Sequence, residues 1–80
     1  MTDARKIGEM ILFHRKKAKL SRVELARLAG VGKTAVFDIE HGKETVRFST
    51  LMKVLGTLNI RVQFNGPLMN AFEKGSNEKS

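Results

Sequence analysis

Cysteine is absent from this 80-residue chain, and so are long apolar runs. Without cysteine there can be no disulfide, no thiolate metal site and no cysteine nucleophile, which fits a reducing compartment. The longest apolar run extends only from Met10 to Phe13, too short to cross a membrane, and the first residues lack the apolar core of a signal peptide. We therefore expect a cytoplasmic protein that makes no membrane contact.

Acidic residues are few compared with basic ones. The chain has 15 Lys and Arg against 8 Asp and Glu, a net charge of +7. Residues 1–65 hold 13 basic and 6 acidic side chains, whereas residues 66–80 hold two of each. The expected folded part, residues 1–65, therefore carries the whole excess. Such a compact basic body favours a polyanionic partner, although a solvated surface has the same composition.

Groupings typical of catalysis are also missing. The two histidines have no metal-binding spacing with Asp38 or Glu40. Ser21 and Ser49 stand where helices are expected to begin, and helix capping explains them. We therefore expect that the protein is not an enzyme and that it holds neither a cofactor nor a metal.

Apolar spacing and capping residues predict four helices in close succession. Asp3 caps the first, and the capping box Ser21-x-x-Glu24 opens the second, which Gly30 ends in the left-handed conformation. Ser49 is expected to cap the fourth. The predicted helices span residues 4–17, 22–29, 33–41 and 50–58.

The turn before the third predicted helix contains Gly32-Lys33-Thr34, which looks like the end of a nucleotide-binding P-loop. A P-loop requires G-x-x-x-x-G-K-[ST] between a strand and a helix, so that the glycine-rich turn wraps the phosphate. Arg27 stands where the first glycine belongs, and the residues before the turn have a helical pattern. We therefore reject a nucleotide site.

Two short helices joined by a tight glycine turn instead predict a helix-turn-helix. Ala26 lets the helices cross closely, and Val36 and Ile39 form the buried face of the second helix. The outer face, which is then free to enter the major groove of DNA, contains Lys33, Thr34, Phe37, Asp38 and His41. Lys33 opposes the helix dipole, and a phosphate or a guanine edge would offset that cost, although a solvated lysine is the alternative.

The segment "LSRVELARLAGVGKTAVFDIEHGK" resembles the phage-repressor (Xre, Cro/CI-type) helix-turn-helix family, and the likeness covers about residues 7–60. It implies an all-α, five-helix, lambda-repressor-like DNA-binding domain with a structural ion pair between Arg15 and Glu40. It also implies a phosphate contact for Arg22, a poorer helix cap at Gly32, and a tolerated, partly buried histidine at His14. The DNA-binding residues expected from the motif and the resemblance are Ser21, Arg22, Lys33, Thr34, Phe37, Asp38, His41, Lys43 and Arg47.

The segment "IRVQF", residues 60–64, alternates apolar and polar residues and predicts one short β-strand. A single strand leaves its backbone groups unpaired, so we expect it to pair antiparallel with a second copy. Ile60, Val62 and Phe64 are the expected dimerisation residues. The alternative is an extended segment that lies on its own body. Residues 66–80 are expected to form a flexible tail with a small apolar island.

In the position of this strand, directly after the fourth helix, the chain resembles the HipB-type antitoxins. That resemblance implies a homodimer on a palindromic operator of double-stranded DNA, associated with the nucleoid, that represses its own operon and binds a HipA-like Ser/Thr kinase toxin. A free-standing regulator of the same family is the alternative. A protein-interaction adaptor is a further one, because Met10, Leu12 and Phe13 add apolar surface that could face the core, a dimer or a partner.

Overall fold

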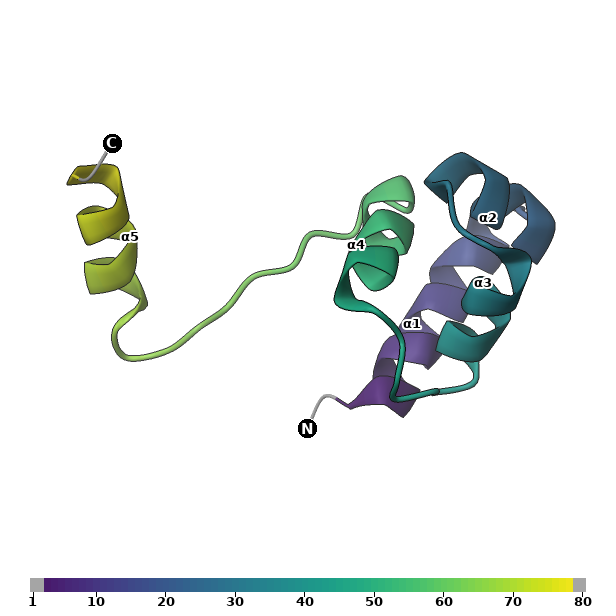
Figure 1. The fold of residues 1–80 in the computed structure, drawn as a ribbon, viewed down its shortest axis with the longest axis horizontal. Helices are drawn as coiled ribbons and strands as arrows, with labels where there is room; N and C mark the ends of the chain where they lie inside the picture. Colours follow the sequence, from purple (N-terminus) through teal and green to yellow (C-terminus); the bar gives the residue numbers. More distant parts are fainter. Residues whose placement is uncertain (1–2, 79–80) are drawn as a thin grey trace.

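The computed structural model describes residues 3–78, and its secondary structure is all-α. The helices are α1 (Ala4–Lys17), α2 (Arg22–Ala29), α3 (Lys33–Glu40), α4 (Phe48–Thr57) and α5 (Met69–Glu78). Figure 1 shows α1 to α4 gathered in one body and α5 standing apart, at the far end of an extended segment. The predicted all-α, five-helix fold class is confirmed, with the fifth helix outside the body.

The starts of α1 and α2 are those that the sequence predicts. The Asp3 carboxylate accepts a hydrogen bond from the Lys6 amide at 2.9 Å. At α2 the capping box is complete, because the Ser21 hydroxyl accepts from the Glu24 amide at 3.0 Å and the Glu24 carboxylate accepts from the Ser21 amide at 2.8 Å. These backbone and side-chain hydrogen bonds with Ser21 lower the pKa of Glu24. Gly30 then ends α2 with φ at 72°, in the left-handed region.

The start of α4 differs from the prediction. The helix begins at Phe48, its cap residue is Arg47, and no side chain caps it. The Leu51 amide already donates to the Arg47 carbonyl at 3.0 Å, so helical hydrogen bonding begins two residues before the position predicted for the cap. Ser49 therefore lies inside the first turn, and its predicted capping role is wrong.

The core lies between the four body helices. Ile11, Leu25, Val36 and Val54, one from each helix, are completely buried. Helix α3 packs against both α1 and α2, and α2 packs against α4. The crossing of α1 and α3 depends on Gly8, because a Cβ atom there would overlap the carbonyl oxygen of Ile39.

Residues 60–66 form an extended arm that leads away from the body, as Figure 1 shows. Within residues 3–78 no strand is formed, because the arm has no backbone partner in a single chain. The predicted pairing with a second copy therefore stays a prediction.

The expected flexible tail, residues 66–80, contains helix α5, which the sequence analysis did not predict, and the flexibility of this segment stays a prediction. Leu68, Met69 and Phe72 have helical spacing, and the polar residues around them obscure this pattern in the sequence. The Phe72 amide donates to the Leu68 carbonyl at 2.9 Å and starts the helical hydrogen bonds.

Candidate DNA-binding interface

Helices α2 and α3 and the turn between them form the predicted helix-turn-helix. Ala26 is buried at the crossing of the two helices, and the Val31 amide donates to its carbonyl at 2.9 Å, which closes the turn. Val36 and Ile39 are buried on the inner face of α3. Gly32 is the N-cap residue of α3 and provides no side-chain hydrogen bond, as expected for a residue that has no side chain. The inner face thus anchors α3 and leaves its outer face available.

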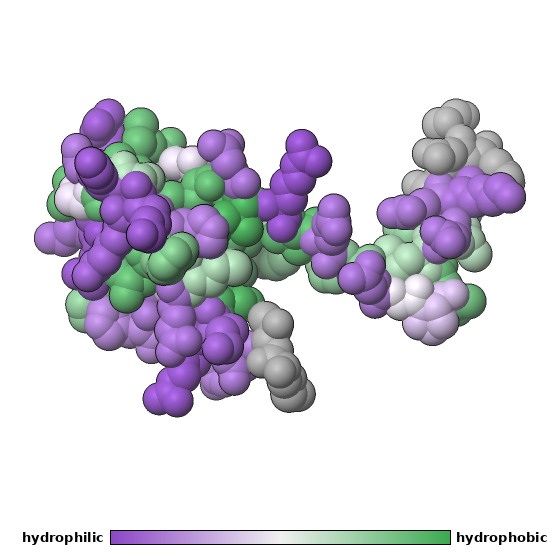
Figure 2. Space-filling model, turned by 180° about the vertical axis from the view of Figure 1, so that it is seen from behind, coloured by the Kyte–Doolittle hydropathy of each residue, from purple (hydrophilic) through white to green (hydrophobic). Residues whose placement is uncertain are grey.

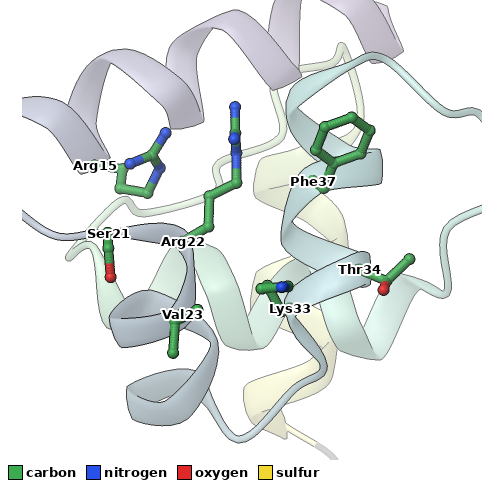
Figure 3. Close-up of a pocket in the computed structure, with 7 residues that line it drawn as sticks. All are labelled: Arg15, Ser21, Arg22, Val23, Lys33, Thr34 and Phe37. Atoms are coloured by element: carbon green, nitrogen blue, oxygen red, sulfur yellow. The ribbon is translucent and has the colours of Figure 1, made fainter.

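The outer face of α3 is open to solvent. Lys33, Thr34, Phe37 and His41 are exposed, and Asp38 is half-buried. Lys33 and Thr34 occupy the first turn and border an open hollow of about 520 Å³ between α2 and α3. Figure 3 shows Arg22 in this hollow between Arg15 and Phe37, with Lys33 and Thr34 at the start of α3. Within residues 3–78 no ion pair neutralises Lys33, so its charge is available to an anionic ligand.

The predicted ion pair between α1 and α3 is present and buried. The Arg15 guanidinium donates to both Glu40 carboxylate oxygens, at 2.6 and 3.1 Å, and also to the Leu20 carbonyl at 2.8 Å. Arg15 and Glu40 are each only 7% exposed. This bidentate contact links α1 to the C-terminal end of α3, the helix that carries the outer face.

A second arginine, Arg22, also contacts Glu40, and the sequence analysis did not predict this contact. The Arg22 Nε donates to a Glu40 carboxylate oxygen at 2.8 Å. Burial alone raises the pKa of Glu40, but the hydrogen bonds and positive charges of Arg15 and Arg22 outweigh that effect and lower it. The carboxylate is therefore held in its charged form between two guanidinium groups.

Arg22 also contacts the outer face, so it connects the buried pair with the surface. Its guanidinium carbon lies 5.2 Å from the centre of the Phe37 ring, a cation–π arrangement. The Phe37 ring is also stacked with the His41 ring, and their centres lie 3.9 Å apart. His41 Nδ1 lies 2.7 Å from the Phe37 carbonyl oxygen, which further restricts the imidazole. Phe37 is thereby held in place although it is 46% exposed.

The other expected DNA-binding residues have local partners or lie outside the hollow. The Ser21 hydroxyl is used in the capping box, although Ser21 lines the hollow. Lys43 Nζ lies 3.3 Å from the Asp38 carboxylate at the C-terminal end of α3. Arg47 is exposed at the start of α4. Lys43 and Arg47 do not line the hollow, so the residues that the fold brings together there are Ser21, Arg22, Lys33, Thr34 and Phe37.

A second surface feature lies between α1, α4 and the arm. This arm groove has a volume of about 480 Å³, and its apolar lining includes Met10, Phe48, Met52, Ile60, Val62 and Phe64. Ile60 is half-buried against the core, whereas Val62 and Phe64 are 40% and 69% exposed. Figure 2 shows hydrophilic side chains over much of one face of the body, with hydrophobic residues gathered where the arm leaves it.

The structure shows the surroundings of the three apolar residues of α1 whose orientation the sequence left open. Met10 packs against the core and lines the arm groove. Leu12 is half-buried, and His14 is likewise half-buried, as predicted. Phe13 is 58% exposed and lies beneath the Lys17 ammonium group, 5.5 Å from it. Of these three residues, only Met10 lines the arm groove.

Within residues 3–78 no three His, Asp or Glu side chains are grouped so that they could hold a metal ion. No helix in the same range combines the length and the apolar character that a membrane crossing requires.

Comparisons with known proteins agree with this geometry. Residues 14–65 match the helix-turn-helix family. The "uncharacterized HTH-type transcriptional regulator y4mF" of Sinorhizobium fredii (strain NBRC 101917 / NGR234) is 36% identical over 76% of this chain and 80% of its own length. The "ImmF control region 10 kDa protein" of Bacillus phage phi105 is 32% identical over 75% of this chain and 67% of its own length.

Solved structures show the same fold. The structure titled "HipB-O4 20mer complex" superposes with a TM-score of 0.75 over 84% of this chain and 94% of its own, at 15% identity. The structure titled "MDT Protein" matches equally well. The chain therefore belongs to the helix-turn-helix family and is a transcriptional regulator of the Xre type.

Proposed function

We propose that this protein is a sequence-specific repressor that binds a palindromic operator of double-stranded DNA as a homodimer. The observation that carries the proposal is the exposed first turn of α3. There Lys33 and Thr34 stand beside Arg22 at the edge of an open hollow, on a helix whose inner face is anchored in the core. Basic side chains at the start of a recognition helix are suited to phosphates and guanine edges.

DNA reading is tested with Lys33→Ala and Thr34→Ala. Each change should alter the preferred base at particular operator positions, because a good contact to a base edge is worth about 1–3 kcal/mol of discrimination. Selection of binding sites from a random pool measures this preference. Lys53→Ala on α4 is the matched control, since it removes an exposed lysine away from the hollow. An identical selected sequence for wild type and Lys33→Ala would contradict the assignment.

Arg22 is expected to act differently from Lys33 and Thr34. If part of its guanidinium contacts a phosphate, Arg22→Ala should weaken binding to all sequences alike and reduce the salt slope by about one unit. Because Arg22 also binds Glu40, a thermal melt of the same variant must accompany the measurement. Unchanged affinity and salt slope in a folded Arg22→Ala variant would restrict Arg22 to its structural contact.

The homodimer is proposed to form through the arm. Pairing two arms antiparallel would satisfy backbone groups without a partner and cover Val62 and Phe64, which are exposed in one chain. A two-fold dimer would then set the two α3 helices about one turn of DNA apart, ~34 Å.

Val62→Pro tests the arm pairing. Proline removes a hydrogen-bond donor from the ladder and does not touch the outer face of α3. We expect the molecular mass to fall toward 9.0 kDa, and palindromic-site binding to weaken far more than half-site binding. Val62→Thr keeps the amide and serves as the control. Light scattering that finds a monomeric wild type at micromolar concentration would disprove the dimer.

The finer part of the proposal is that this regulator is the antitoxin of a HipA-like Ser/Thr kinase toxin and represses their shared operon. Its support is the strand-like arm after α4 and the likeness in fold to HipB. A HipA-like kinase gene beside this one, whose product co-purifies with this chain, is the expected result. A neighbourhood without such a gene would favour a free-standing Xre regulator. Binding only to proteins, with no loss of affinity on adding salt, would favour an adaptor.

A further inference from the structure

Two apolar stripes of this chain lie open in the structure. On α5 and the residue before it, Leu68 and Phe72 are 74% and 67% exposed, four residues apart. On α4, Phe48 and Met52 have the same spacing and are 67% and 37% exposed. Side chains four residues apart lie on one face of a helix, so each pair forms a continuous stripe. Large apolar side chains exposed in rows indicate a surface that is covered in the working assembly.

The arm keeps these two stripes apart within one chain. Its seven residues, 60–66, can span about 23 Å when extended. In Figure 1 it runs from the body to α5 without turning back, and the extensively packed helix pairs of the described chain lie within the body. The α5 stripe is therefore out of reach of its own α4 in this arrangement.

A second copy brings the two stripes together. If the arms pair antiparallel about a two-fold axis at Val62, Ile60 of one copy lies opposite Phe64 of the other, and Gly66 lies opposite Leu58. Since α5 begins three residues after Gly66, it starts beside the end of the partner's α4. The α4 stripe adjoins the arm, because Phe48 and Met52 line the same groove as Val62 and Phe64.

We propose that α5 of each copy packs on α4 of the other, so that the Leu68–Phe72 stripe covers the Phe48–Met52 stripe. The exchange is reciprocal, and every dimer contains the contact twice. It rests on the proposed dimer through the arms and adds a second interface to it. The contact lies on the arm side of the body, so it leaves the outer face of α3 open to DNA.

Cross-linking between copies tests the exchange directly. Because the chain has no native cysteine, any disulfide that forms must join the introduced cysteines. Phe72→Cys and Met52→Cys are made as single variants, mixed and mildly oxidised. We expect a disulfide-linked dimer that contains one chain of each kind. A further mixture, with Phe48→Cys in place of Met52→Cys, tests the other residue of the α4 stripe. The double variant with Phe72→Cys and Met52→Cys should give a covalent dimer. A monomer with an internal disulfide would overturn the proposal and place α5 on its own body.

Dimer dissociation gives a second, independent measurement. Phe72→Glu puts a charge into the proposed contact, and Asn70→Glu puts the same charge on an exposed polar position of α5. We expect Phe72→Glu to raise the dimer Kd on the order of a hundred- to ten-thousand-fold, because one aromatic side chain in each of the two copies loses its burial, and Asn70→Glu to leave the Kd nearly unchanged. Thermal melts should show that both variants retain the folded body.

The results separate this inference from the proposed function. A monomeric wild type would refute the arm dimer and the exchange together. A dimeric wild type that binds the palindrome, with equal dimer Kd values for Phe72→Glu and Asn70→Glu, would refute the exchange alone and leave the proposed function intact.

Discussion

Glu40→Gln should lower the free energy of unfolding by about 3–5 kcal/mol, because it removes the only carboxylate that two guanidinium groups share in the described chain. Arg15 is 7% exposed and cannot recover its hydration when that charge is lost. For a domain of this size the expected fall in melting temperature is about 15 °C or more. Thermal unfolding followed by circular dichroism measures it.

Asp38→Asn is the matched control for this change. It also converts a carboxylate to an amide on α3, but its partner Lys43 is exposed, and such pairs contribute only about 0–1 kcal/mol. A Glu40→Gln variant that melts within a degree or two of Asp38→Asn would mean that the buried network does not stabilise the fold.

The same network predicts how stability changes with pH. Because the folded protein holds the pKa of Glu40 below its usual value, the carboxylate's contribution to stability is fully present above the unfolded pKa and is lost as pH falls through the lower folded pKa. Wild type should therefore lose stability in this acidic range. Glu40→Gln should lose less, with a remaining slope from Glu24, whose pKa is also lowered.

Gly8→Ala should destabilise the body by about 2 kcal/mol, although alanine favours a helix more than glycine does. The new Cβ atom would overlap the Ile39 carbonyl oxygen and lie 3.0 Å from that of Glu40. Both obstacles are backbone atoms, so α1 and α3 must move apart. Overpacking of this kind costs about 1–3 kcal/mol or more, whereas the helical preference returns only about 0.5–1 kcal/mol.

Gly56→Ala is the control, because nothing lies within 4 Å of a Cβ atom added to this glycine of α4. There the helical preference acts alone, and we expect stabilisation of about 0.5–1 kcal/mol. The two variants should thus shift the urea midpoint in opposite directions. A stabilised Gly8→Ala variant would contradict the close crossing of α1 and α3.

Much of the body was predictable because its signals are local. A capping box, a left-handed glycine and an apolar period each act within a few residues, so α2, its end at Gly30 and the buried face of α3 follow from short patterns. The pairing of Arg15 with Glu40, 25 positions apart, came instead from the family resemblance, and the structure confirms it. The start of α4 was missed, because Arg47 precedes the helix without a side-chain cap and Ser49 offered a stronger local pattern.

Contacts between distant elements required the structure. No pattern in the sequence shows that Arg22 reaches Glu40 and at the same time covers Phe37, because the crossing of α2 with α3 brings these side chains together. The need for a glycine at position 8 likewise arises from a backbone on another helix. The arm depends on a contact that even one folded chain does not supply. The alternation of Ile60, Val62 and Phe64 predicts a strand, but a single chain leaves this segment unpaired. Local chemistry sets where the helices begin and end, whereas which side chains share a charge or a groove depends on how those helices cross.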